Sequence, residues 1–152
     1  REASPDFILR TTVMLGFPGE TEEQFELLYD FLKNEPFDRV GAFVFCPEDG
    51  TKAALMDGQI DEATAKARLD KIMRMQQTVS LELNKKRIGK EYEVLIERVD
   101  KDACYGRSYA EAPDVDGIIK IKNVPVCVKP GDFIYAKITD ASAYDLKGEF
   151  VK

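Results

Sequence analysis

The most constraining feature of this sequence is a change of hydrophobic period near residue 90. Up to that point, strand-like apolar runs and helical spacing follow one another, whereas from Tyr92 onward apolar and polar residues alternate as in strands. The period of the apolar residues decides which kind of element can bury them, so the two halves need different architectures. We therefore expect two domains, residues 1–87 and residues 88–152, the first α/β and the second all-β.

The first half opens with a strand, a helix and a second strand. Residues 7–15 form a nearly continuous apolar run, which is typical of a strand buried on both faces of a parallel sheet. Thr21 and Gln24 have the spacing of a capping box, which predicts a helix that ends before Pro36. Residues 39–46 supply the second strand, so the three elements form one βαβ unit.

A long helix follows these elements. Asp61 can cap the N-terminus of this helix. Gly89 can end the helix near Arg87, because glycine readily adopts the left-handed backbone conformation that follows a helix. Its helical spacing predicts a buried face made of Leu69, Ile72, Met73, Gln76, Val79 and Leu83.

The second half contains four more strand-like runs after the one that starts at Tyr92. Turn-forming residues separate them, and they cover residues 103–109, 117–121, 132–140 and 144–151. Five short strands in so short a stretch predict a small closed or nearly closed β-barrel.

The residue types that are missing exclude several kinds of chemistry. The chain has no His and no Trp, which excludes Ser-His-Asp and Cys-His catalysis and His-ligated zinc within it. Its three cysteines, Cys46, Cys104 and Cys127, lack the close spacing of a metal site, and we interpret them as reduced, small apolar residues. No apolar run is long enough to span a membrane, and no signal segment is evident, so we expect a cytoplasmic protein.

The charge of the chain bears on its partners. The net charge is −6, with 12 basic and 16 acidic residues before Ile88 and 10 basic and 12 acidic residues from Ile88 onward. Neither half has the excess of Lys and Arg that neutralises nucleic-acid phosphates, although a local basic patch can be hidden in an acidic total. We therefore expect a basic protein partner, with RNA less favoured and no membrane.

Two glycine-bearing loops follow the two strands of the first half. In parallel α/β folds, ligands bind beyond the carboxyl ends of the strands, so we expect both loops on one rim. The candidate cofactor-binding residues are Gly16, Phe17, Gly19, Glu20, Phe45, Pro47, Glu48 and Gly50. An ordinary strand-to-helix turn would also explain the glycines, the helix dipole would explain Glu20, and a solvated loop would explain Glu48. Alternating aromatic residues in a strand are more often part of a core.

In the second half, aromatic, basic and acidic residues gather near the expected loops. The candidate docking residues are Arg107, Tyr109, Asp114 and Asp145, and further acids nearby are Glu111, Asp116 and Asp140. Aromatic residues beside Arg are typical of protein hot spots and of nucleic-acid readers alike. The acids favour a cationic protein over a phosphate backbone, and a plain solvated acidic surface is the alternative.

Several segments carry a resemblance to a known family. The segment TTVMLGFPGET at residues 11–21 and the segment 37–51, which ends in PEDGT, closely resemble late barrel strands and their loops in the radical-SAM methylthiotransferases. The segment GRSYAEAPDVDG at residues 106–117 resembles the TRAM domain of the RimO type. Shorter similar segments are residues 74–77, 130–133 and 144–146. The chain thus resembles the C-terminal part of a RimO-type enzyme along essentially its whole length.

The resemblance implies both a fold and a reaction. The fold would be the C-terminal remnant of a radical-SAM partial (β/α) barrel, followed by a small five-stranded TRAM (OB-like) β-barrel. The complete enzyme would methylthiolate the β-carbon of an aspartate in a basic small-subunit ribosomal protein, using S-adenosylmethionine and two 4Fe-4S clusters. The rim residues would pack around adenosine, and the TRAM module would dock the substrate.

The chain departs from the family pattern in its cysteines. It lacks the CxxxCxxC motif and the further cysteines that hold the two clusters, and it begins with Arg1. We therefore expect a C-terminal fragment that binds no cofactor, is inactive alone, and can self-associate through a bare sheet edge. In the complete enzyme, we expect Gly16→Val to abolish S-adenosylmethionine cleavage and to leave the fold intact.

Two alternatives stay open. One is the MiaB-type tRNA methylthiotransferase, which the acidic PEDG loop at residues 47–50 and the APDVDG segment at residues 112–117 disfavour. The other is an isolated RNA- or protein-binding module. RNA binding that weakens steeply with salt would favour either alternative.

Overall fold

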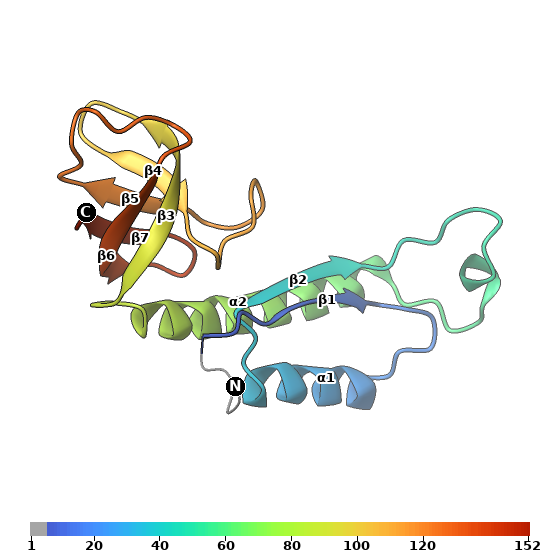
Figure 1. The fold of residues 1–152 in the computed structure, drawn as a ribbon. Helices are drawn as coiled ribbons and strands as arrows, with labels where there is room; N and C mark the ends of the chain where they lie inside the picture. Colours follow the sequence, from blue (N-terminus) through green and yellow to red (C-terminus); the bar gives the residue numbers. More distant parts are fainter. Residues whose placement is uncertain (1–5) are drawn as a thin grey trace. The chain divides into compact units, whose positions relative to one another are not determined.

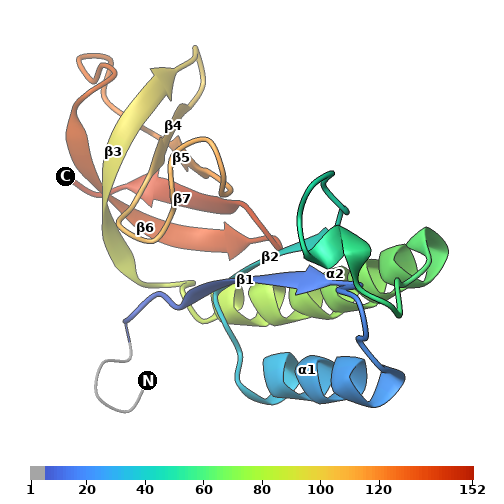
Figure 2. The same ribbon diagram turned by 90° about the vertical axis from the view of Figure 1, so that its right-hand side faces the viewer.

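The computed structural model of the chain describes residues 6–152, which fold into two compact units (Figures 1 and 2). One unit ends at Val79 and the other begins at Ser80. The elements in chain order are β1 (Arg10–Leu15), α1 (Glu22–Asn34), β2 (Arg39–Val44), the 3-10 turn η1 (Ala53–Leu55), α2 (Glu62–Lys85), β3 (Glu91–Val99), β4 (Cys104–Arg107), β5 (Ile119–Lys122), β6 (Phe133–Ala141) and β7 (Leu146–Phe150). None of the described helices is long and apolar enough to cross a bilayer.

The first unit contains the predicted strand, helix and second strand. β1 is not buried on both faces as expected, however, because every second residue is exposed, including Met14 at 43%. β1 and β2 pair in parallel, with Leu15 opposite Val44 at their carboxyl ends. α1 begins at the predicted capping box, in which the Gln24 N–H donates to Thr21 Oγ1 at 3.2 Å and the Thr21 N–H donates to Gln24 Oε1 at 3.1 Å. Alternate strand residues and one stripe of each helix meet in a single apolar cluster. Its buried members are Leu15, Phe25, Leu32, Val40 and Ile72.

The buried face of α2 differs from the predicted one. In the first unit its buried residues are Ala65, Arg68, Ile72 and Gln76. Leu69 and Met73, which were expected on this face, are only half-buried. Arg68 and Gln76 tolerate burial because they have partners: Arg68 pairs with Glu20, and Gln76 Nε2 donates to a backbone carbonyl at 3.0 Å. Ile72 and Gln76 are thus buried as predicted, whereas a pattern that counts apolar residues does not register a paired cation such as Arg68.

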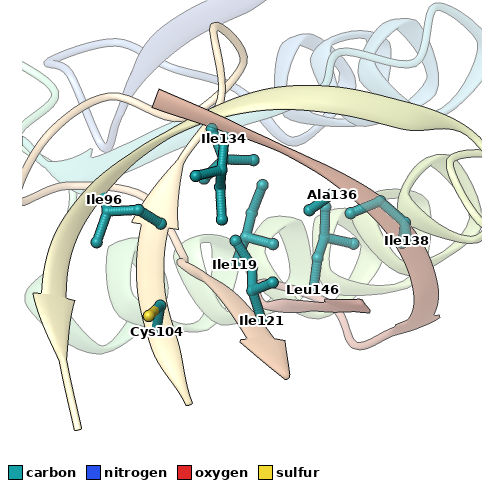
Figure 3. Close-up of a cluster of buried hydrophobic side chains, with 9 residues drawn as sticks. Ile96, Cys104, Ile119, Ile121, Ile134, Ala136, Ile138 and Leu146 are labelled. Carbon is teal, nitrogen blue, oxygen red and sulfur yellow. The ribbon is translucent and has the colours of Figure 1, made fainter. Parts of the chain in front are cut away.

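The second unit is a closed barrel of five strands in the order β3-β4-β5-β7-β6. Neighbouring strands are antiparallel except for the parallel pair β5–β7. Alternate residues point inward, as the period-two pattern predicts, and fill the interior with mostly branched side chains (Figure 3). The buried members are Val94, Ile96, Cys104, Ile119, Ile121, Ile134, Ala136, Ile138 and Leu146. The predicted small β-barrel is thus confirmed, and it is closed.

The last turns of α2 belong to the second unit. Asn84 is almost completely buried, and its Nδ2 donates to two carbonyls of the β6–β7 turn at 3.0 and 3.2 Å. Gly89, with φ of +86°, lies beyond the end of the helix as predicted and donates its N–H to the Ile138 carbonyl at 2.8 Å. These contacts explain why the compact units divide after Val79. A domain boundary between residues 87 and 88 is a prediction from the sequence pattern.

Candidate functional site

The two predicted rim loops lie side by side. They follow β1 and β2, whose parallel pairing puts both carboxyl ends at one edge of the sheet. The Phe45 N–H donates to the Leu15 carbonyl at 2.8 Å, so the second loop starts as a continuation of the strand pairing. The rings of Phe17 and Phe45 then meet edge to face, with centroids 5.2 Å apart. The prediction that the two loops share one rim is confirmed.

The carboxylate of Glu20 holds the first loop in shape. Its Oε2 accepts the Gly16 N–H at 3.1 Å, and its Oε1 accepts from Arg68 Nη1 at 2.5 Å. The Arg68 side chain is only 8% exposed, and its Nη2 reaches Glu22 Oε2 at 2.9 Å. Both oxygens of Glu20 are therefore engaged within the protein. A role of Glu20 toward a ligand stays a prediction.

Gly16 is required by backbone geometry and by packing. Its φ is +75°, and a Cβ added to it would lie 2.6 Å from the Ala65 Cβ on α2. A valine at this buried position would therefore push the loop away from α2, so the expectation that Gly16→Val leaves the fold intact is wrong. Gly19 has a φ of +84° with open space around it, and its N–H donates to the Gly58 carbonyl at 2.9 Å.

The remaining rim residues face solvent, except that Phe45 is half-buried. The exposed ones are Phe17, Pro47, Glu48 and Gly50. Thr51 shapes the second loop, because its N–H and its hydroxyl both donate to the Glu48 carbonyl, at 3.2 and 2.8 Å. The rim thus offers an aromatic pair, an exposed carboxylate and open backbone at Gly50. Such groups can pack against a flat ring and accept hydrogen bonds from hydroxyl groups.

The predicted docking residues lie in the β4–β5 loop, at the end of β4 and in the β6–β7 turn of the barrel. Arg107 Nε donates to Glu97 Oε1 at 2.7 Å, and Asp145 Oδ1 accepts the Ile118 N–H at 3.0 Å. Tyr109 is 64% exposed, and Asp114 is exposed as well. Arg107 and Asp145 are therefore held by hydrogen bonds within the barrel. Tyr109 and Asp114 are exposed to solvent, and the Tyr109 ring also lies 6.2 Å from that of Tyr92.

Glu111 lies in a buried ion pair and not on the acidic surface that the sequence suggests. Its Oε1 accepts from Arg87 Nη1 at 2.5 Å, and its Oε2 accepts from Ser108 N at 2.9 Å and Ser108 Oγ at 2.6 Å. Arg87 Nη2 also donates to Ser108 Oγ at 3.0 Å. The sequence analysis missed Arg87, because a basic residue beyond a helix end is ordinarily explained by the helix dipole.

The ionisation of this pair follows from its surroundings. Burial disfavours the charged form of Glu111, but the Arg87 guanidinium and the hydrogen bonds from Ser108 outweigh it, so the pKa of Glu111 lies below its ordinary value. Burial likewise works against the charge on Arg87, but Glu111 outweighs it and raises the pKa of Arg87. Both groups are therefore charged at neutral pH, and each satisfies the other.

A basic row crosses the outside of the barrel, which the composition does not reveal. Strand register places Arg98, Tyr105, Lys120 and Lys147 opposite one another on β3, β4, β5 and β7 in turn. The Arg98 guanidinium lies 4.0 Å from the centroid of the Tyr105 ring, and Lys120 Nζ lies 5.7 Å from it. A hollow of about 600 Å³ lies beside Tyr105 and Lys120. This row combines cations with an aromatic ring, as surfaces that bind phosphate chains do.

The cysteines form no cluster in the described part of the chain. Cys104 lies in the barrel interior, where burial and then Asp100 raise the pKa of its thiol. Cys46 and Cys127 are exposed and, like Cys104, unpaired. Within residues 6–152, no three His, Cys, Asp or Glu side chains come together as a metal site. The thiols in this part therefore do not provide the ligand set of an iron–sulfur cluster.

Comparison with known proteins agrees with this architecture. Residues 88–151 match the TRAM domain. The chain is 47% identical to the ribosomal protein uS12 methylthiotransferase RimO of Carboxydothermus hydrogenoformans over 99% of its own length and 35% of that protein. It is 48% identical to the protein of that name from Dictyoglomus thermophilum and 45% identical to that from Pasteurella multocida, over 99% of its own length and 34% of each relative. The chain spans about a third of the length of these curated relatives, and over that stretch it belongs to the RimO-type methylthiotransferase family.

Proposed function

We propose that this chain is part of an enzyme that adds a methylthio group to ribosomal protein uS12, at the β-carbon of an aspartate. In this proposal the TRAM barrel docks the substrate. The observation that carries the docking role is the exposed tip of the β4–β5 loop, where Tyr109 and Val115 are 64% and 75% exposed and Asp114 lies between them in sequence. An aromatic and an apolar side chain beside an acid suit a basic protein partner.

The rim of the first unit would hold the adenosine side of S-adenosylmethionine. Phe17 and Phe45 already form an edge-to-face pair that can pack against adenine, and Glu48 and Gly50 are open to ribose hydroxyl groups. Glu20 would act indirectly, because its carboxylate shapes the loop that carries Phe17. When bound, S-adenosylmethionine supplies radical chemistry at an unactivated C–H bond.

The chain's own residues do not fit the two 4Fe-4S clusters of the proposed enzyme. Its three thiols are dispersed, and Cys104 lies inside the barrel. We therefore expect the chain alone to be inactive. Cluster reconstitution followed by electron paramagnetic resonance should give no four-iron signal, and a genuine signal would contradict this expectation.

Titration calorimetry of the 152-residue chain with recombinant uS12 tests the docking role. Tyr109→Ala should weaken binding by about 30-fold, the effect of a hot-spot residue, and Asp114→Asn should weaken it by removing an attractive charge. The matched controls are Tyr135→Ala and Asp102→Asn, an exposed tyrosine and an exposed acid outside this loop. Equal effects of test and control variants would remove the β4–β5 loop from the docking surface.

The basic row favours RNA binding as a second candidate function, which belongs to the MiaB-type alternative or to an isolated binding module. Lys120 adds positive charge beside the Arg98–Tyr105 pair, whereas Lys147 is paired with Asp140. Binding of single-stranded RNA should then weaken steeply between about 50 and 200 mM salt, and Lys120→Ala should flatten that dependence. RNA binding that is absent at low salt would exclude this function.

Self-association through the bare edge of the two-stranded sheet β1–β2 is proposed for the first unit. Met14 and Phe43 lie opposite each other on β1 and β2 and are 43% and 46% exposed, so the sheet presents an apolar face. Sedimentation at increasing concentration should detect a dimer that Met14→Gln weakens. A strictly monomeric chain would contradict the proposal.

A further inference from the structure

The base of the β4–β5 loop is held by more buried polar contacts than a solvated loop needs. The Glu111 side chain is 2% exposed and that of Arg87 is 11% exposed. Ser108 Oγ donates to Glu111 and accepts both from Arg87 and from Ala110 N, the latter at 3.3 Å. Both oxygens of the buried carboxylate are thus engaged, one by Arg87 and the other by Ser108 at the start of the loop.

The same cluster supports the exposed part of the loop. The Arg87 guanidinium lies over the Tyr92 ring, 4.6 Å from its centroid, and the Tyr92 ring lies 6.2 Å from that of Tyr109. Further along, Asp116 closes the loop on itself, because its Oδ2 accepts the Ala112 N–H at 2.7 Å. A chain of contacts therefore leads from the buried pair to the side chain that faces solvent.

A buried ion pair is a poor source of stability, because the cost of removing both charges from water offsets most of their attraction. Its clearer physical effect is on conformation. A displaced loop would leave Arg87 or Glu111 buried without a partner, so alternative arrangements are strongly disfavoured.

We propose that Arg87, Ser108 and Glu111 are positioning residues that fix the β4–β5 loop in its docking conformation before a partner binds. This inference rests on the proposed docking of a basic ribosomal protein. A loop that is ordered in advance loses less conformational entropy on binding, so the partner meets Tyr109 and Asp114 already in place.

Two variants of the 152-residue chain separate positioning from folding. The double variant Arg87→Met/Glu111→Leu replaces the pair by apolar groups of similar size, which a buried site tolerates better than one unpaired charge. Ser108→Ala keeps the pair and removes only the hydroxyl. The matched control is Lys66→Met/Glu62→Leu, which removes an exposed pair on α2 whose side chains are 66% and 76% accessible.

Two readouts are needed, namely affinity for recombinant uS12 and hydrogen exchange at the amides of residues 108–112. We expect both test variants to keep the circular dichroism spectrum of the barrel, to exchange these amides at least about 10-fold faster, and to bind uS12 about 10-fold more weakly. The control variant should change neither readout. If the double variant fails to fold, Ser108→Ala alone decides the question.

The outcomes distinguish this inference from the proposed function. If a folded test variant keeps its loop amides protected and binds uS12 like the parent chain, the positioning inference is overturned and the docking proposal stands. If the parent chain does not bind uS12, the docking proposal fails, and hydrogen exchange still decides whether the cluster orders the loop. Faster exchange with unchanged affinity also overturns the inference, because the loop would then be ordered without serving binding.

Discussion

Replacing Gly16 by Ala should destabilise the first unit by about 2–5 kcal/mol, the sum of two separate costs. The φ of +75° lies in the left-handed region, which costs a residue with a Cβ about 1–2 kcal/mol. The new Cβ would also lie 2.6 Å from the Ala65 Cβ, and relieving such overpacking costs about 1–3 kcal/mol. Gly19→Ala is the matched control, since its φ is +84° but nothing lies within 4 Å of the added Cβ.

Urea unfolding of the whole chain, followed by the helical circular dichroism signal of α1 and α2, measures this difference. Gly16→Ala should lower the free energy of unfolding by about 1–3 kcal/mol more than Gly19→Ala does. On an Ala65→Gly background, where the overlap is removed, Gly16→Ala should cost no more than the control. Equal losses in the two single variants, or an undiminished loss on the Ala65→Gly background, would refute the packing argument.

Three further predictions concern helix capping, a buried cation and pH. Thr21→Ala removes the hydroxyl that accepts from the Gln24 N–H in the capping box and should cost about 1 kcal/mol in the same urea experiment. Arg68→Met leaves the Glu20 carboxylate without its cation and should cost about 3 kcal/mol, with faster amide exchange in the first rim loop. Because the pKa of Glu111 is lowered on folding, its contribution to stability is present above its ordinary value of 4.5 and is lost as the pH falls through the folded-state pKa. Acid unfolding of the barrel should therefore depend on pH more steeply below about 4.5 in the parent chain than in Glu111→Gln, and identical pH profiles would contradict this.

Local signals in the sequence predicted the elements well. The capping box, the apolar run of β1 and the period-two pattern of the barrel each depend on neighbouring residues, so a single sequence carries them. The two rim loops could also be placed, because parallel strands bring their carboxyl ends to one edge. The buried face of α2 was predicted only in part: Ile72 and Gln76 are buried as expected, but Arg68 was missed because it is charged and gives no apolar signal.

By itself, the sequence determined the order of the elements, the small β-barrel and the family, because apolar period, turn residues and long similar segments are properties of the chain. Only the tertiary structure decided what the charged residues do. Glu111 pairs with Arg87 in a buried site, Glu20 accepts a hydrogen bond from the Gly16 N–H, and Lys120 lies in a basic row on the barrel. The physical reason is that the type of a charged residue does not reveal whether its charge is solvated or paired. Its partners lie many residues away, at positions that only folding brings within hydrogen-bonding distance.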